Sequence, residues 1–174
     1  MKKNGFTLVE LLAVIAILAI LVIIALPNVM GMFNQAKKNS FTTEVKEIFK
    51  MAQQQWISDS MLATKPITYS RVGGTATDNN TGNGLDMSGR TELDYAIEFN
   101  KAGEVVAYVA TDNTYYFKFI MDSTTYTDVL KIEDIGTNEN GKDYEVKTLT
   151  DEDKTGATVA VDSDGHATIT LTAD

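Results

Sequence analysis

A single apolar run occupies the first part of the chain. Residues 11–26 are 16 consecutive apolar residues, and counted from Phe6 the run has 21 residues interrupted only by Thr7 and Glu10. A helix of that length spans about 30 Å, which is enough to cross a lipid bilayer. The pattern therefore predicts one membrane-spanning helix close to the N-terminus.

The helical pattern resumes after Pro27 in an amphipathic form. Apolar positions recur at spacings of three and four residues, as expected for one face of a helix; they are Val29, Phe33, Phe41, Val45, Ile48, Phe49, Ala52 and Trp56. Proline lacks an N–H and clashes with the preceding turn, so a bend is expected at Pro27. We predict one helix over residues 6–59, about 80 Å long, with Phe49 and Trp56 in the core.

The period changes to two in the rest of the chain, which predicts antiparallel strands. Strands are expected at residues 95–99, 105–110 and 115–121, joined by turns at 100–103 and 112–113 into a meander. Residues 157–161 and 167–171 are expected to form a hairpin about the turn 162–165. The fold class is thus α+β, with a long N-terminal helix packed on an antiparallel sheet.

Three segments give weaker signals. Residues 71–91 are rich in Gly, Asn and Thr and are expected to be a loop. Residues 124–132 fit a short helix or a fourth strand equally well. Residues 136–156 are polar and rich in turn formers, so no long element is expected there.

The charge of the chain is unevenly placed. The 174 residues carry a net charge of −9, but residues 59–174 contain 9 Lys and Arg against 21 Asp and Glu, a balance of −12. An acidic domain of this kind repels nucleic acid, so no nucleic-acid partner is expected. The chain has no cysteine, which excludes disulfides and thiolate metal sites.

Glu10 is the residue that needs an explanation. A carboxylate inside a membrane costs about 2.5–3.5 kcal/mol on insertion scales, and such acids usually have a functional partner. Lys2 and Lys3 precede the run and place the N-terminus in the cytoplasm and the later domain outside. A secretory signal peptide, a plain signal anchor and an unrelated membrane protein are the alternatives; Glu10 and the absence of an A-x-A cleavage pattern count against the signal peptide.

The motif around Glu10 resembles a known processing signal. Gly5-Phe6-Thr7-Leu8-Val9-Glu10 directly follows lysines and opens an apolar run, and it is similar to the class III signal of type IV pilins and of the pseudopilins of type II secretion and competence systems. The resemblance implies the pilin fold, cleavage by a prepilin peptidase after Gly5, N-methylation of Phe6, an assembly role for Glu10 and a helix kink at Pro27.

The resemblance also implies a division of the chain. Residues 1–5 would be a leader peptide, 6–27 the transmembrane and filament-core half of the helix, 28–60 its amphipathic half, and 61–174 a globular β domain. Cleavage after Gly5 creates an ammonium at Phe6, and in a filament Glu10 of one subunit can neutralise that amine on another. Because an unpaired buried charge is strongly penalised, this pairing would also set the register of assembly.

Other candidate sites have simpler explanations. Asp162 and Asp164 are spaced like the start of a calcium loop, but Asp-Gly between alternating strands is first a hairpin signal, so a turn is favoured over a metal site. His166, the only histidine, is expected to be a solvated strand residue. Tyr108, Tyr115 and Tyr116 could form a surface aromatic patch, although alternation makes at least one a core residue. No catalytic constellation and no cofactor are expected.

These observations predict a structural subunit, specifically a major pilin of a type IV pilus. Its expected partners are further copies of itself in a helical filament, a prepilin peptidase, an inner-membrane assembly platform and minor pilins. The expected location is the cytoplasmic membrane before assembly and an extracellular filament afterwards. A pseudopilin of a type II secretion or DNA-uptake system, a minor pilin at a filament tip, and an unrelated signal-anchored domain are the alternatives.

Overall fold

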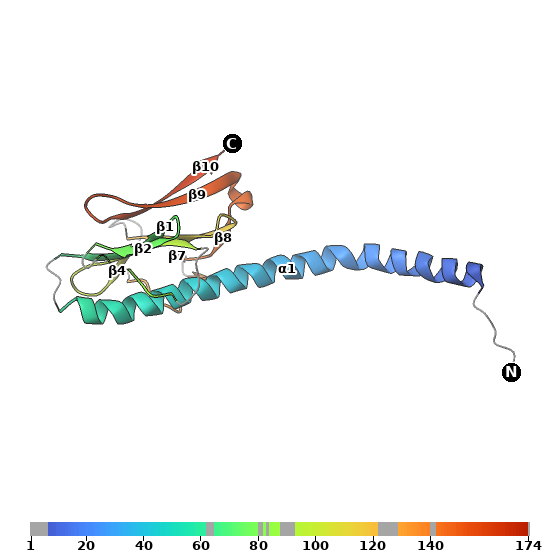
Figure 1. Cartoon of the computed structure of the whole chain (residues 1–174), viewed down its shortest axis with the longest axis horizontal. Coiled ribbons are helices and arrows are strands. Elements are labelled where there is room, and N and C mark those ends of the chain that lie inside the picture. Colours follow the sequence, from blue (N-terminus) through green and yellow to red (C-terminus); the bar gives the residue numbers. More distant parts are fainter. Residues whose placement is uncertain are drawn as a thin grey trace. The chain divides into compact units, whose positions relative to one another are not determined.

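The structure, a computed structural model, describes residues 7–61, 65–79, 82, 84–87, 93–121, 129–139 and 142–173. The chain divides into two compact units, Met1–Asn39 and Ser40–Asp174. Helix α1 (Leu8–Asp59) contributes to both units, and antiparallel strands follow it (Figure 1). This architecture confirms the expected α+β fold class.

The strands form one larger sheet and two small ones. Their bounds are β1 (Ile67–Val72), β2 (Thr75–Asp78), β3 (Asp94–Phe99), β4 (Val105–Thr111), β5 (Tyr115–Ile120), β6 (Asn138–Glu139), β7 (Lys142–Asp143), β8 (Lys147–Thr148), β9 (Lys154–Val161) and β10 (Ala167–Ala173), with a short 3-10 helix, η1 (Thr150–Glu152), before β9. The six-stranded main sheet has the order β2-β1-β3-β4-β5-β8, while β9 pairs with β10 and β6 pairs with β7. The meander over β3, β4 and β5 and the β9–β10 hairpin confirm the sequence-based prediction.

Helix α1 is continuous from Leu8 to Asp59 and includes Pro27. The expected C-terminal end of the helix is confirmed, and Pro27 does not end the helix. The bend expected at Pro27 stays a prediction. The structure reports nothing on Phe6, which lies outside the described residues.

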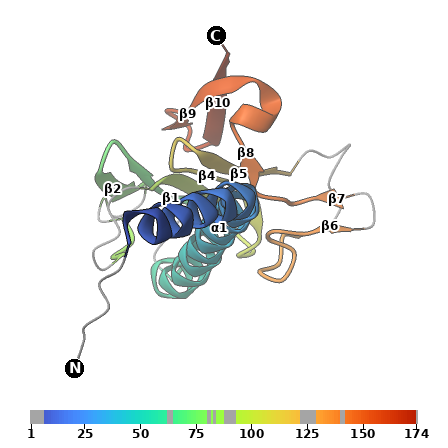
Figure 2. The ribbon, with the colours of Figure 1, turned by 90° about the vertical axis from the view of Figure 1, so that its right-hand side faces the viewer.

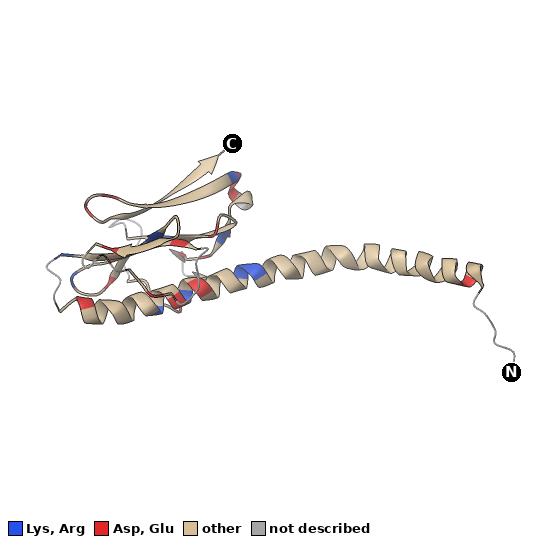
Figure 3. Ribbon diagram, in the orientation of Figure 1, with Lys and Arg blue, Asp and Glu red and all other residues tan. Residues whose placement is uncertain are grey.

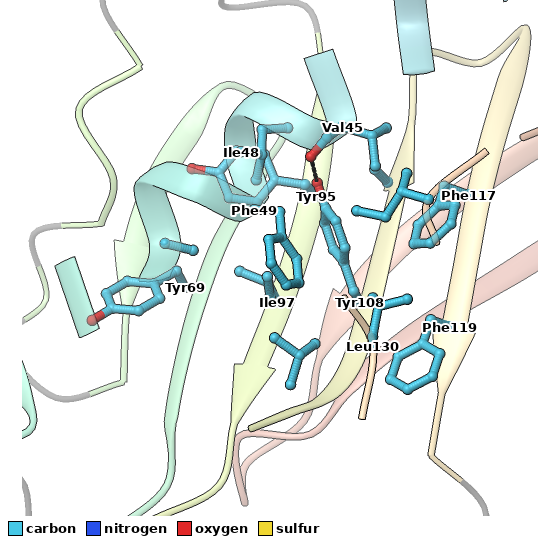
Figure 4. Close-up of a cluster of buried hydrophobic side chains, with 14 of the residues drawn as sticks. Val45, Ile48, Phe49, Tyr69, Tyr95, Ile97, Tyr108, Phe117, Phe119 and Leu130 are labelled. Carbon is cyan, nitrogen blue, oxygen red and sulfur yellow. Dashed lines mark hydrogen bonds between the residues drawn. The ribbon is translucent and has the colours of Figure 1, made fainter. Parts of the chain in front are cut away.

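The last part of α1 covers one face of the main sheet. Phe41, Val45, Ile48, Phe49 and Ala52 are at most 2% exposed. They pack against large side chains of the sheet (Figure 4), which include Tyr69, Tyr95, Ile97, Tyr108, Phe117 and Phe119. These five helical residues were all part of the predicted stripe, whereas its first two members, Val29 and Phe33, are more than half exposed.

A tyrosine ties the helix to the sheet. The Tyr108 hydroxyl donates a 2.7 Å hydrogen bond to the carbonyl oxygen of Val45, and its ring contacts those of Phe49 and Phe117. Tyr115 and Tyr116 are also buried. The hypothesis of a surface patch formed by the three tyrosines is therefore wrong, because both faces of the sheet are covered.

The β9–β10 hairpin covers the opposite face of the main sheet (Figure 2). Side chains alternate along each strand, so Ile97 faces α1 while its neighbour Ala96 faces the hairpin. Ala96, Ala107 and Val109 form a second small cluster with Val159 and Ala167 of the hairpin. The unit Ser40–Asp174 is thus built of three layers, with the helix and the hairpin on opposite faces of the sheet.

The expectation that residues 71–91 form a loop is wrong for its first part. Strand β1 ends at Val72, and β2 begins at Thr75 with Val72 and Thr75 paired. Gly73 and Gly74 both have positive φ, 57° and 83°, which matches the two-residue turn that fits the twist of a hairpin. Gly-Gly between β-branched residues is itself a hairpin signal, and it was interpreted only as a chain breaker.

Of the other weak segments, residues 122–128 and 140–141 lie outside the described residues. The choice between helix and strand for 124–132 therefore stays open. Of residues 136–156, the described part up to Asp153 holds only two-residue strands and η1, as expected. The last residues of this segment differ from the prediction, because strand β9 begins at Lys154 and not at residue 157.

Two buried tyrosines allow a test of the bond between helix and sheet. Replacing Tyr108 with Phe removes the hydrogen bond to Val45, so we expect the free energy of unfolding to fall by about 1 kcal/mol. The measurement is equilibrium unfolding in detergent followed by the fluorescence of Trp56, the single tryptophan, which stacks on Phe99.

Tyr95→Phe is the matched control. The Tyr95 hydroxyl is buried and has no hydrogen-bond partner within the described part of the chain, and burial raises its pKa to about 12. Removing an unpaired buried hydroxyl should leave stability unchanged or increase it. Equal losses in both variants would contradict the role assigned to the Tyr108–Val45 bond.

Candidate processing and assembly site

The N-terminal part of α1 presents an exposed apolar surface in the part of the chain that the structure describes. Its large apolar side chains between Leu8 and Phe33 are 46–78% exposed, and no charged residue lies between Glu10 and Lys37. By length and composition, α1 is able to cross a membrane. A contiguous apolar surface of this extent is typical of a segment that contacts lipid or another protein.

Glu10 lies in the first turn of this helix and is held by Thr7. The Thr7 backbone N–H and hydroxyl both donate to Glu10 Oε2, at 2.8 and 2.7 Å. In return, the Glu10 backbone N–H lies 3.3 Å from the Thr7 hydroxyl oxygen. This reciprocal arrangement is a capping box, in which an N-cap Thr and a Glu three residues later satisfy backbone donors of the first turn.

The capping box fixes the Glu10 carboxylate at the N-terminal end of α1 and supplies hydrogen-bond donors to it. A carboxylate in the first helical turn also interacts favourably with the positive end of the helix dipole. Thr7-x-x-Glu10 is a capping signal in the sequence, and it gives Glu10 a local role besides that of a charge in an apolar run. Gly5 and Phe6, the predicted cleavage and methylation residues, lie outside the described residues.

Pro27 and Gly31 form a locally weak place within the same helix. Pro27 has no N–H to donate to the carbonyl four residues earlier, although the helix remains continuous. One turn later, a Cβ added to Gly31 would meet no atom within 4 Å. Glycine in a helix costs about 1 kcal/mol relative to alanine, so this turn is held less firmly than its neighbours.

The carboxylate of Asp162 closes the turn of the β9–β10 hairpin. The backbone N–H groups of His166 and Asp164 both donate to Asp162 Oδ1 at 2.9 Å, and these bonds lower the pKa of Asp162 below its ordinary value. Within the described residues no cluster of three or more His, Asp or Glu side chains could hold a metal ion. The turn predicted for residues 162–165 is thus observed, and the Asp162 side chain accepts hydrogen bonds that close it.

His166 anchors the hairpin to the main sheet. Its side chain is 64% exposed, but Nδ1 lies 3.0 Å from Oε1 of Glu98, a carboxylate of β3 that is only 9% exposed. Glu98 Oε2 also accepts a 3.4 Å hydrogen bond from the backbone N–H of Ala167. A further bond joins the Thr68 hydroxyl to the carbonyl of Gly165.

This ion pair is not visible in the sequence, because the partners are 68 residues apart. His166 was expected to be a solvated residue, and its exposed ring agrees with that expectation. Glu98 stands in an alternating strand, where a polar residue indicates a solvent-facing side. Only the hairpin, by covering that side, turns Glu98 into a buried group that needs a partner.

The comparison with known proteins bears on the N-terminal segment. Residues 1–26 match the family model of the prokaryotic N-terminal methylation motif. This match confirms the class III signal identified in the sequence and supports a type IV pilin-like protein with a structural role. It also implies processing by a prepilin peptidase, assembly into a pilus or pseudopilus, and membrane anchoring. Neither a curated protein nor a solved structure matches the chain.

The Glu98–His166 pair predicts a pH dependence of stability. The hydrogen bond to Glu98 raises the pKa of His166 above its ordinary value. A raised pKa means that the folded state favours the protonated imidazole. The pair therefore stabilises the fold fully below the pKa of the unfolded state, about 6.5, and this contribution is lost as pH rises through the higher folded-state pKa.

The measurement is the unfolding midpoint of the wild-type chain and of His166→Gln between about pH 5.5 and 8.5, a window around the ordinary histidine pKa. The wild type should be the more stable of the two at the acidic end, and the difference should shrink toward the basic end. A difference that grows with pH, or that is constant, would show that the imidazolium does not contribute in this way.

Proposed function

We propose that this chain is the major pilin of a type IV pilus. The observation that carries the proposal is Glu10, the one charged group between Leu8 and Ala36 in the exposed apolar part of α1, placed in the first helical turn and within the matched motif. The acidic globular unit, with helix and hairpin on opposite faces of its sheet, supports a subunit whose helix faces inward and whose hairpin faces solvent. Motility and adhesion are functions that such a filament could serve.

The proposed assembly step is an exchange of partners by Glu10. In the single chain Glu10 accepts hydrogen bonds from Thr7, which are neutral donors. After cleavage following Gly5, the methylated amine of Phe6 is a cation at the end of the same apolar helix. When Glu10 of one subunit meets the Phe6 amine of another, two charges that are costly in an apolar environment become one neutral pair.

This pairing gives both a driving force and a register. The rest of the helix surface up to Phe33 is apolar and packs against other helices without directional bonds. A charge pair that must be satisfied therefore selects one axial offset among many similar ones. Pro27 and Gly31 would then allow the helix to adjust, since the turn between them is weakly held.

The proposal places the chain in two locations in succession. Lys2 and Lys3 favour a cytoplasmic N-terminus, with the globular unit outside the membrane. A prepilin peptidase, an assembly platform and minor pilins are the proposed partners. The matched motif is shared with pseudopilins, and a pseudopilin of a secretion or DNA-uptake system would use the same assembly step.

Removing the charge of Glu10 tests the assembly step. Glu10→Gln keeps the size and the acceptor oxygen but leaves the Phe6 amine unneutralised, so we expect filaments to be lost while cleavage continues. The readouts are electron microscopy of shed filaments and mass spectrometry of the membrane fraction. Glu133→Gln, which removes the same charge from an exposed site of the globular unit, is the matched control and should leave filaments unchanged.

Abundant filaments from Glu10→Gln would contradict the charge-pairing mechanism. Filaments that are absent even from wild-type cells, with a cleaved and methylated chain, would instead favour a short pseudopilus.

Processing is tested separately by the mass of the mature chain. We expect the polypeptide to begin at Phe6 and to carry one methyl group on its amine. Replacing Gly5 with a bulky residue should leave an uncut chain in the membrane, because the class III signal that this sequence resembles has glycine directly before the cleavage point. An uncut wild-type chain would return the protein to the signal-anchor alternative.

A further inference from the structure

The β9–β10 hairpin has two long edges that no other described strand covers. It forms a sheet of only two strands, although its inner side is packed on β3 and β4. An uncovered edge presents backbone N–H and C=O groups that can pair with another strand. Proteins usually protect such edges with charges, proline, bulges or short strands.

The turn determines which backbone groups of β10 face its free edge. The Asp162 N–H donates to the carbonyl of His166, so the bonded pairs continue at every second residue, through Thr168, Thr170 and Thr172 with their partners in β9. The backbone groups of Ala167, Ile169 and Leu171 point the other way, toward the free edge. Ala167 supports this assignment, because its N–H bonds to Glu98 rather than to β9.

Strand β10 has little of the usual protection, namely one irregularity in its pairing with β9, between Thr172 and Ala173. Residues 167–173 contain no charge, no proline and no glycine, and Figure 3 shows this strand without charged residues. Three threonines alternate along its exposed side, and Ile169 and Leu171 are half-buried beneath. Strand β9 differs, since it begins with Lys154 and contains Gly156. A seven-residue uncharged strand with high β-propensity is typical of segments that associate with themselves.

We propose that the free edge of β10 binds the β10 edge of a second copy of this chain. The two strands would run antiparallel about a two-fold axis at Thr170, which joins the two hairpins into one four-stranded sheet. In this register Ile169 of one copy exchanges backbone hydrogen bonds with Leu171 of the other. An isologous contact of this kind needs only one self-complementary surface.

We choose a second copy as the partner for two reasons. The edge is self-complementary, and many copies of it would lie close together on the surface of a filament. This step rests on the proposed function: a filament presents many identical hairpins on its outer side, so weak pairings between neighbouring filaments add up. The contact would hold filaments side by side in bundles. It differs from the helix packing proposed to build each filament, which would use the exposed apolar part of α1 between Leu8 and Phe33.

Cysteine crosslinking tests the contact directly, since the chain has no native cysteine. At the two-fold axis the two Thr170 residues form a non-hydrogen-bonded pair, whose Cα atoms lie about 4.5 Å apart, within the range that a disulfide bridges. Thr170→Cys should therefore give disulfide-linked dimers of the full-length chain under mild oxidation, in filaments and in detergent. The side chain is exposed, so the fold should be retained.

Thr158→Cys is the matched control. Thr158 is the cross-strand partner of Thr170 in β9 and is also exposed, but in the proposed pair it lies one strand away from the contact. It should give no dimer. Thr170→Lys should in addition separate bundled filaments into single ones, whereas Thr158→Lys, with the same charge change, should leave bundles intact.

The outcomes separate this inference from the proposed function. Dimers from Thr170→Cys, with none from Thr158→Cys, support the edge contact. This holds even if wild-type cells make no filaments and the pilus proposal fails. Equal crosslinking at both positions, or none at Thr170→Cys in chains that are folded by circular dichroism, would overturn the contact while leaving the assembly role of Glu10 untouched. Bundles that persist in Thr170→Lys would overturn its role between filaments.

Discussion

The burial of one apolar stripe of α1 against the main sheet is the interaction on which the globular unit depends. Phe41, Val45, Ile48, Phe49 and Ala52 are removed from water, and each large side chain contributes about 1.5–3 kcal/mol through its burial. The sheet supplies aromatic partners in return, and the Tyr108–Val45 bond adds a directional contact. A helix that is packed in this way can carry an unpartnered apolar extension without unfolding.

The exposed part of α1, from Leu8 to Phe33, is instead unfavourable in water. Its large apolar side chains are exposed, and burial in lipid or against other helices would be favourable for them. Glu10 opposes both environments unless its charge is compensated. Thr7 satisfies the carboxylate through hydrogen bonds in the single chain, and a cationic amine on a neighbouring subunit would satisfy it more fully. Under the proposed function, Thr7 would hold this carboxylate in the membrane-bound subunit, and the amine of a neighbouring subunit would hold it in the filament.

The β9–β10 hairpin adds a third layer to the helix and the sheet. Residues on the second face of the sheet are therefore buried instead of exposed to solvent. Glu98 becomes a buried anion that His166 and the Ala167 N–H accommodate. Ala96 and Ala107 become contact residues whose small size permits close approach of the hairpin. The hairpin also introduces a strand edge, along β10, that no other described strand covers, and periodicity along the chain does not reveal such an edge.

The sequence by itself determined the elements whose signals are local. The apolar run, the stripe ending at Trp56, the meander and the hairpin turn at Asp162 all follow from periodicity and turn chemistry, and the signal around Glu10 follows from a contiguous motif. The tertiary structure decided which faces of the sheet are covered. It buried Tyr108, Tyr115 and Tyr116, paired Glu98 with His166, and placed β1 beside β3. Those outcomes depend on contacts between residues far apart in the chain, and hydrophobic periodicity reports only whether a strand has two unlike faces, not what covers each face.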